Sequence, residues 1–270
     1  MNFTQKSELI REKNKSNLVI GLDTDLQKIP VYFLNYKNPA LEFNKAVIDC
    51  TKDICAGYKL NIAFYEYLEE SGIEAMRESL KAIPDELIKI CDAKRGDIDN
   101  TAEKYAEVYF DKYNFDSVTI SPYMGTDSIK PFIKRNNKHV FVLALTSNNS
   151  YADFEMLKAG ERHLYEHVTE TILSAGSEDN TGFVFGANHL QEIKNFSEKN
   201  PGVSLLIPGI GAQGNDPAIL IENVKTKNFV INSSREIIYA AEKEDSLSLI
   251  SEKIRTSAVK LNKIIRSNEN

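Results

Sequence analysis

The sequence predicts an α/β fold, a single (β/α)8 TIM barrel. Short runs of apolar and β-branched residues recur along the chain, and segments with helical spacing of apolar residues lie between them. Apolar strands that alternate with amphipathic helices are typical of a parallel sheet covered by helices. Eight such units in 270 residues favour a closed barrel, with an open doubly wound sheet as the second choice.

The expected strands and helices follow one another in regular alternation. Strands are expected at residues 18–22, 56–60, 87–91, 117–120, 140–145, 182–185, 204–207 and 229–231. Helical spacing is clearest in three sets of residues, namely Phe43, Val47, Cys50 and Ile54, then Leu164, Val168 and Ile172, and last Ile250, Ile254, Ala258 and Leu261. No run rich in proline, glycine or serine interrupts the pattern. We therefore expect one domain over residues 1–270, with a short solvated tail from residue 266.

The third expected strand leads into the most informative stretch, where an acid, a base and a second acid follow at fixed spacing. Asp92 and Lys94 are two residues apart at the strand end, so their side chains point to the same side. A structural ion pair is the simplest interpretation of two such charges. Asp97 adds a third charge to the loop, and desolvating three charges is costly unless they pair or take part in chemistry. The stretch therefore favours a catalytic role.

The helix after this loop is expected to begin at Asn100. Glu103 follows three residues later, which is the spacing of a capping box. This start leaves Asp97 and Ile98 in the connecting loop.

Polar residues also follow other expected strands, at the ends that a barrel brings to one face. They are Asp23 after the first strand, Lys59 and Asn61 at the second, Thr146 and Ser147 after the fifth, Gln213 after the seventh and Arg235 after the eighth. Each by itself could form a turn or point to solvent. Together they predict one shared site at the C-terminal ends of the strands.

The loops after the last two strands have the composition of a phosphate site. Residues 209–214 (Gly-Ile-Gly-Ala-Gln-Gly) offer unhindered backbone N–H groups, and Ser234 and Arg235 open a helix. Barrels commonly bind phosphate with these two loops. We expect Arg235 to supply a bidentate charge and Gln213 a neutral donor, with a glycine turn beside a surface arginine as the alternative.

The overall charge points to a small ligand. The chain has 39 acidic and 33 basic residues, a formal charge of −6, with its lysines scattered along helical faces. This argues against nucleic acid or an anionic membrane as a partner. The N-terminus lacks the apolar core of a signal peptide, and no stretch approaches the roughly 20 apolar residues of a membrane span. A cytoplasmic protein is expected.

The cysteines and histidines predict no metal site. The three cysteines, Cys50, Cys55 and Cys91, lack metal-ligand spacing and are expected to be buried free thiols. The four histidines, His139, His163, His167 and His189, are spread along the chain without a ligand pattern and are expected to be structural.

With these residues in view, the chain resembles the orotidine 5′-phosphate decarboxylase family, most closely its bacterial branch with longer chains. Residues 92–101, DAKRGDIDNT, are similar to the family's D-x-K-x-x-D-I signature. Five further segments of this chain resemble other parts of the family's sequences: GLD at 21–23, KLNIAFYE at 59–66, SPYMG at 121–125, LTSN at 145–148 and PGIGAQG at 208–214. The likeness therefore covers nearly the whole chain. The resemblance implies conversion of orotidine 5′-monophosphate to uridine 5′-monophosphate in pyrimidine synthesis, without metal or organic cofactor.

The resemblance also implies a role for each site residue. Lys94 would donate a proton to the ring carbon that loses CO2, with Asp92 beside the substrate carboxylate. Lys59 and Asp97 would complete an alternating Lys-Asp-Lys-Asp network, and Lys59 would also contact the ribose. The substrate-binding residues would be Asp23 on the ribose, Ser147 on the pyrimidine, Gln213 and Arg235 on the phosphate, and Ile98, Thr101, Pro208, Gly211, Gly214 and Ser234.

The family's pattern further implies a homodimer. Asp97, Ile98 and Thr101 would reach into the site of the neighbouring subunit. The resemblance assigns no role to Tyr123, Asn148, Asn188 or His189.

Three other functions stay open. A metal-dependent sugar-phosphate decarboxylase or lyase on the same barrel would hold Mg²⁺ with Asp92 and a partner acid, but Lys59 stands where that acid is wanted. A Schiff-base aldolase would need an unprotonated lysine, which flanking carboxylates disfavour. A non-catalytic nucleotide-phosphate binding protein would be expected to lose one of the costly buried charges.

Overall fold

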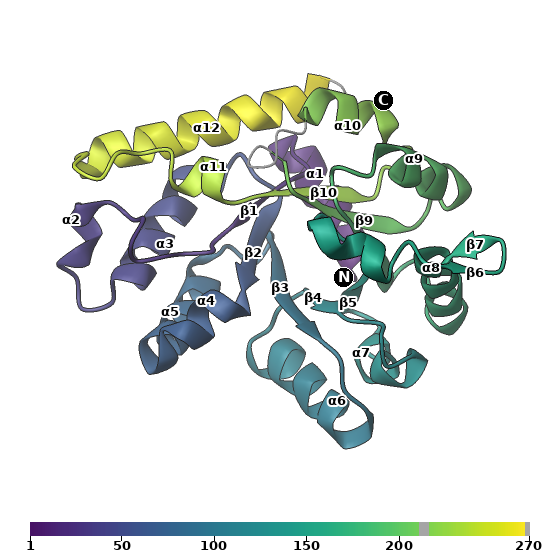
Figure 1. Ribbon diagram of the computed structural model, residues 1–270. Coiled ribbons are helices and arrows are strands. Elements are labelled where there is room, and N and C mark those ends of the chain that lie inside the picture. Colours follow the sequence, from purple (N-terminus) through teal and green to yellow (C-terminus); the bar gives the residue numbers. More distant parts are fainter. Residues whose placement is uncertain (211–215, 268–270) are drawn as a thin grey trace.

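The computed structural model describes residues 1–210 and 216–267, and in this part of the chain eight parallel strands close into a barrel. The strands are β1 (Leu18–Gly21), β2 (Gly57–Asn61), β3 (Ile88–Arg95), β4 (Ser117–Ile120), β5 (His139–Leu145), β8 (Thr181–Phe185), β9 (Ser204–Pro208) and β10 (Phe229–Ser233). They pair in chain order, and β10 returns to β1. Figure 1 shows the strands at the centre and the helices around them. The predicted (β/α)8 barrel is confirmed.

Helices and helical turns connect the strands. They are α2 (Val31–Leu34), α3 (Pro39–Thr51), α4 (Ile62–Tyr67), α5 (Glu69–Ala82), α6 (Asp99–Ala106), η1 (Glu107–Lys112), η2 (Thr126–Ser128), α7 (Lys130–Ile133), η3 (Asn149–Asp153), α8 (Leu164–Ala175), α9 (Leu190–Lys199), α10 (Pro217–Asn223), α11 (Arg235–Ile238) and α12 (Leu247–Ser267). Within the described ranges, no helix has the length and apolar character needed to cross a membrane.

Local sequence explains where the longer helices start and which face they bury. Helix α3 begins after Asn38, whose side chain accepts from the N–H of Leu41, and Pro39 occupies its first turn. Helix α12 lies along the top of Figure 1 and buries the predicted apolar stripe that includes Ile250 and Ile254. The regular spacing of apolar residues therefore predicted these helices correctly.

Two predicted boundaries are wrong. The first is the end of helix α3, which stops at Thr51, before Ile54. Helix α6 begins at Asp99 with Ile98 at its N-cap, and no side chain caps it, so the predicted capping box of Asn100 does not form. These ends depend on tertiary packing, which short sequence signals describe poorly.

Two elements were not predicted from the sequence. One is a short antiparallel pair between β5 and β8, formed by β6 (Lys158–Ala159) and β7 (Arg162–His163). The other is the N-terminal helix α1 (Phe3–Asn14), which is capped by Asn2.

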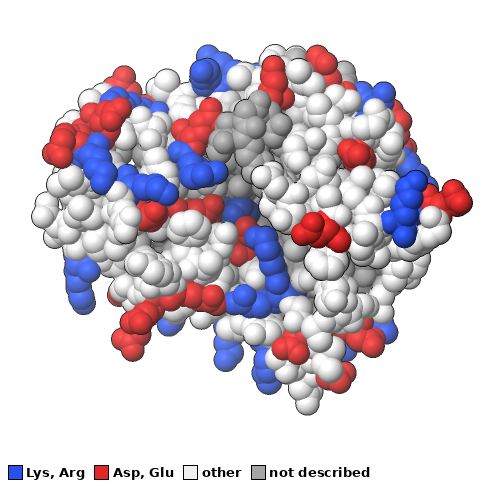
Figure 2. Space-filling view, viewed as in Figure 1, with Lys and Arg blue, Asp and Glu red and all other residues white. Residues whose placement is uncertain are grey.

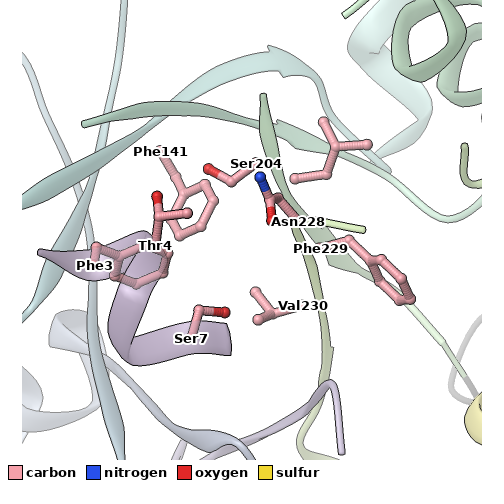
Figure 3. A pocket seen from close by; sticks show the side chains of 9 residues that line it. Phe3, Thr4, Ser7, Phe141, Ser204, Asn228, Phe229 and Val230 are labelled. Atoms are coloured by element: carbon pink, nitrogen blue, oxygen red, sulfur yellow. The ribbon is translucent and has the colours of Figure 1, made fainter. Parts of the chain in front are cut away.

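Helix α1 closes the end of the barrel at which the strands begin. Its side chains contact residues just before five strands: Thr4 with Asp179, Lys6 with Asp116, Arg11 with Lys227, Lys13 with Glu86 and Asn14 with Cys55. Figure 3 shows Phe3, Thr4 and Ser7 of this helix facing Phe141, Ser204 and Val230. The cavity between them holds about 10 Å³, which is room for one water molecule. A ligand therefore needs the opposite end.

His139 is fully buried at the closed end of the barrel. Its ring stacks on Phe3 at a centroid distance of 4.3 Å, and Nε2 lies 2.7 Å from the hydroxyl of Ser204. Burial lowers the pKa of His139 to about 3. The imidazole is therefore neutral at pH 7 and serves the core, as expected for a structural histidine.

This burial predicts a loss of stability in acid. The unfolded state binds a proton near pH 6.5 and the folded state only near pH 3, so the free energy of unfolding falls as the pH drops between these values. Between pH 6.5 and 4.5, His139 should lower the free energy of unfolding by about 2 kcal/mol. Denaturant unfolding of wild type and His139→Gln across this range measures the difference.

The half-buried His167 of α8 provides the control, because His167→Gln should leave the pH dependence as in wild type. If His139→Gln also leaves it unchanged, the neutral state of the buried imidazole is not what limits stability in acid.

Candidate active site

A chain of alternating charges crosses the mouth of the barrel at the C-terminal ends of β1, β2 and β3. The ammonium of Lys94 lies 2.6 Å from Oδ1 of Asp92, and Oδ2 of Asp92 lies 3.0 Å from the ammonium of Lys59. Lys59 in turn lies 3.6 Å from Oδ1 of Asp23. Figure 2 shows acidic and basic side chains meeting in the hollow at the centre of this face. The predicted pocket of opposite charges is thus formed by these four residues.

Exposure changes along this chain of charges. The side chain of Lys59 is 4% exposed and that of Asp92 is 12% exposed, whereas the side chain of Lys94 is 48% exposed. Lys94 is therefore the end of the chain that is open to an incoming ligand.

The neighbouring charges keep Lys59 and Asp92 ionised. Burial by itself would raise the pKa of the Asp92 carboxyl, but Lys59 and Lys94 outweigh this and hold that pKa below its usual value. Burial would likewise lower the pKa of the Lys59 ammonium, but Asp23 and Asp92 outweigh it and raise that pKa. At pH 7 the site therefore holds a carboxylate between two ammonium groups.

Strand β3 leaves regular geometry where it carries these charges. Lys94 has a φ of 48°, in the left-handed region that non-glycine residues rarely adopt. The pairing of β3 with β4 is irregular between Cys91 and Arg95. In this interval the N–H groups of Ala93 and Lys94 both donate to the hydroxyl of Thr119, a residue that the sequence analysis did not single out.

A cavity of about 320 Å³ lies beside the charges and is lined by residues from four of the predicted loops. Asp23, Ser147, Gly209, Ser234 and Arg235 line it, together with Lys28, Phe64, Ile210, Asn232, Glu236 and Tyr239. The hydroxyl of Ser234 donates to Oδ2 of Asp23 at 2.8 Å. Gly209 has a φ of 98°, which explains a glycine directly after Pro208, the last residue of β9. The structure thus brings Asp23, Ser147, Ser234 and Arg235 together.

Other predicted residues do not join this constellation. Gly211, Gln213 and Gly214 lie outside the described residues. Asp97 accepts from the N–H of Ile98 at 2.9 Å and takes no part in the ion pairs at the mouth that the structure describes. Within one chain, the alternating network therefore ends at Asp23 and does not include Asp97. Ile98 and Thr101 are exposed.

The loop after β5 is held by residues that the sequence analysis missed or left without a role. The carboxylate of Glu155 accepts from the N–H and the hydroxyl of Thr146, and Nε2 of His189 lies 2.8 Å from the carbonyl oxygen of Thr146. Oδ1 of Asn148 also lies 2.7 Å from the Thr146 hydroxyl. Thr146 thus anchors the loop and leaves the neighbouring Ser147 at the cavity wall.

No metal cluster is formed by the residues that the structure describes. Groups of three or more histidine, cysteine, aspartate or glutamate side chains placed to hold a metal ion do not occur in residues 1–210 and 216–267.

Comparisons with known proteins agree on one family. The sequence model described as "Orotidine 5'-phosphate decarboxylase / HUMPS family" matches residues 16–250. The chain is 45% identical over 236 residues to the orotidine 5′-phosphate decarboxylase of Christiangramia forsetii, covering 85% of this chain and 86% of that protein. It is 41% identical to the protein of the same name from Flavobacterium johnsoniae, covering 97% and 96% of the two chains.

A solved structure extends the likeness to the fold. The OMP decarboxylase of Leishmania donovani is 31% identical, covers 99% of both chains and superposes with a TM-score of 0.85.

The position of Asp92 between two lysines predicts a large effect of neutralising it. Asp92→Asn should lower the free energy of unfolding by about 2–4 kcal/mol at pH 7, because it leaves buried Lys59 with one distant partner. Since the folded pKa lies below the unfolded value of 3.8, the difference should be full above about pH 4 and shrink at lower pH. Denaturant unfolding at several pH values measures it.

Asp127→Asn is the matched control, because Asp127 forms an ion pair with Lys130 while its side chain is 73% exposed. If the two substitutions lower the free energy of unfolding equally, the position of Asp92 between two lysines does not add to its contribution to stability.

Proposed function

The chain belongs to the orotidine 5′-phosphate decarboxylase / HUMPS family, and from this premise we propose that Lys94 is the proton donor of its reaction. The protein is a carboxy-lyase that decarboxylates orotidine 5′-monophosphate in pyrimidine biosynthesis. The observation that carries the role of Lys94 is its half-exposed ammonium, held at 2.6 Å by an ionised and buried Asp92 at the mouth of the barrel.

The reaction needs a cation where negative charge develops. When the bond to the carboxylate breaks, CO2 leaves and its bonding electron pair stays on the ring carbon. The ammonium of Lys94 stabilises that charge and then transfers a proton to the same carbon. Lys59 is too deeply buried to do this, and it instead holds Asp92 and Asp23 in place.

Asp92 adds an effect on the ground state. A substrate carboxylate placed about 4 Å from it would be repelled by about 4 kcal/mol at an effective dielectric constant near 20. This is a partial contribution, because releasing CO2 from an unactivated ring carbon has a far higher barrier. Carbanion stabilisation and binding energy from the rest of the nucleotide supply the remainder.

The cavity beside the charges suits the ribose and phosphate of the nucleotide. Its wall combines Asp23 and Ser234, which suit ribose hydroxyls, with Arg235, which suits a phosphate dianion. Ser147 lies on the same wall, and we assign it to the pyrimidine ring. With the phosphate bound in this cavity, the reacting ring carbon at the other end of the nucleotide would lie near Lys94.

The metal-dependent lyase on the same barrel is the second candidate. It needs an acidic ligand at the end of β2, and there the structure has the buried Lys59, 3.0 Å from Asp92. A cation beside Asp92 would have to displace that ammonium. A Schiff-base mechanism is disfavoured as well, because the carboxylates raise the pKa of Lys59 and keep it protonated.

We further propose that the whole chain acts as one domain in the cytoplasm. Cys55 and Cys91 are free and buried, and burial raises the pKa of the Cys55 thiol to about 12. Thiols of this kind suit a reducing compartment.

The role of Lys94 predicts the outcome of an ultraviolet assay with orotidine 5′-monophosphate. Wild type should turn over equally with and without EDTA, and Lys94→Ala should lower kcat/KM by at least about 10⁴-fold because it removes both the cation and the proton. Lys81→Ala is the control, since Lys81 pairs with Glu78 on the outer helix α5 with its side chain 67% exposed.

Loss of activity in EDTA would favour the metal-dependent lyase. Tight nucleotide binding without turnover would instead identify a binding protein.

A homodimer with shared sites is the second part of the proposal. Among the described residues, the ion pairs at the mouth of the barrel do not include Asp97 of the same chain. Yet Asp97 lies only three residues after Lys94, in the loop that follows β3. The segments that follow β2, β3 and β4 expose Tyr67 at the end of α4, Ile98, Tyr123 and Met124. These strands are neighbours in the barrel, so the apolar side chains lie in one sector of the mouth, as a subunit interface requires.

Shared sites predict complementation between inactive variants. In a heterodimer of Lys94→Ala and Asp97→Ala, one site would combine the intact Lys94 of one subunit with the intact Asp97 of the other. Co-refolding equal amounts should therefore restore about a quarter of the wild-type activity, because half of the dimers are mixed and each has one intact site.

Lys94→Ala mixed with Asp92→Ala is the control, since both residues belong to the same subunit's site and no complete site can form. Restoration in both mixtures, or in neither, would contradict the shared site.

A further inference from the structure

We propose that Thr119 of β4 is a positioning residue for the reaction: its hydroxyl holds the irregular turn of β3 and thereby sets the place of the Lys94 ammonium. The inference rests on the proposed role of Lys94. It adds a residue on a neighbouring strand that need not touch the substrate.

The hydroxyl of Thr119 uses its full hydrogen-bonding capacity on one short segment. It accepts from the N–H of Ala93 at 3.0 Å and from the N–H of Lys94 at 2.9 Å, and it donates to Oδ1 of Asp92 at 3.0 Å. A hydroxyl has one donor and two acceptor sites, so all of them are occupied. Thr119 is 1% exposed, and water does not compete for these bonds.

These bonds replace a missing part of the β3–β4 ladder. Cys91 pairs with Val118 and Arg95 pairs with Ile120, so β3 advances four residues while β4 advances two. The extra residues need hydrogen-bond partners for their N–H groups, and leaving each buried group unpaired costs about 1–3 kcal/mol. Thr119 lies between the two paired positions of β4 and supplies the acceptor.

The same bonds compensate for the strained backbone at Lys94. A φ of 48° costs a lysine on the order of 1 kcal/mol compared with regular strand geometry. Its N–H must therefore be held for the conformation to persist. Without the Thr119 hydroxyl, β3 would gain by relaxing toward a regular ladder, and the Lys94 side chain would leave its place.

The third bond connects the turn to the reacting group. Oδ1 of Asp92 accepts both from Thr119 and from the ammonium of Lys94, the latter at 2.6 Å. Thr119 therefore fixes the carboxylate oxygen that holds the proposed proton donor. A displacement of about 1 Å at such a group can cost 10²-fold in rate.

Two substitutions separate the hydroxyl from the packing of Thr119. Thr119→Val keeps the β-branched shape and removes the hydroxyl, whereas Thr119→Ser keeps the hydroxyl and removes a methyl group. We expect Thr119→Val to lower kcat by about 10–100-fold with KM within about threefold of wild type, and Thr119→Ser to keep kcat within about threefold.

The pH dependence of kcat gives a second readout. The hydroxyl of Thr119 donates to the carboxylate of Asp92, and such a donor favours the charged form of the carboxylate. Thr119→Val should therefore raise the pKa of Asp92 and move the acid limb of the kcat profile to higher pH, whereas Thr119→Ser should leave this limb in place. A role in packing alone would not shift this limb.

Thr181→Val is the matched control. Thr181 is a fully buried strand threonine whose hydroxyl donates to Asn180 at the start of β8, away from the mouth. Its kcat and pH profile should equal those of wild type.

The outcomes distinguish this inference from the function it rests on. If wild type is active, Lys94→Ala is inactive and Thr119→Val keeps the wild-type kcat and pH profile, the positioning role is wrong and the role of Lys94 stands. Equal losses in Thr119→Val and Thr119→Ser would also overturn it, since packing would then explain both. If wild type does not turn over the nucleotide, the proposed function fails first.

Should Thr119→Val fail to fold, Thr119→Ser and Thr119→Cys still decide. The side chain of cysteine is close in size to that of serine, but its thiol is a weak hydrogen-bond donor and acceptor. We therefore expect kcat to fall at least about tenfold in Thr119→Cys and not in Thr119→Ser. Equal kcat values in the two variants would overturn the inference.

Discussion

The ammonium of Lys59 is buried between the carboxylates of Asp23 and Asp92, and the other features of the site depend on this arrangement. A lysine at this depth without partners would lose its proton or destabilise the fold. The two carboxylates keep it charged, and it keeps Asp92 ionised and holds both carboxylates in place. Asp92 then has a second oxygen left for Lys94, so the buried pair determines where the exposed ammonium lies.

The cost of that arrangement is an irregular strand. A regular β3 would pair residue by residue with β4 and could not present Asp92 and Lys94 as the structure does. The strand instead gains two residues against its neighbour, and Lys94 adopts a left-handed backbone conformation. Departures of this kind concentrate at functional sites, where surrounding contacts must hold them. Here a single threonine hydroxyl makes three of those contacts.

The two ends of the barrel divide stability from chemistry. At the closed end, α1 spans the starts of five strands and covers a neutral, buried His139. At the open end, polar and charged side chains from several strands surround a cavity. Packing at the closed end stabilises the fold, so the open end can hold charged side chains that add nothing to the hydrophobic core. Barrels of this kind commonly separate stability and chemistry in this way.

The sequence by itself determined the alternation of strands and helices, and with it the barrel and the face that holds Asp23, Lys59, Asp92 and Lys94. These follow from the local periodicity of apolar residues and from polar residues at strand ends, which a single sequence records directly. Only the tertiary structure decided that Asp23, and not Asp97, ends the charge network within one chain, that α1 closes the barrel and that Thr119 holds Lys94. Such contacts join residues far apart in the chain, and their partners depend on the register between neighbouring strands, which the periodicity of each strand does not contain.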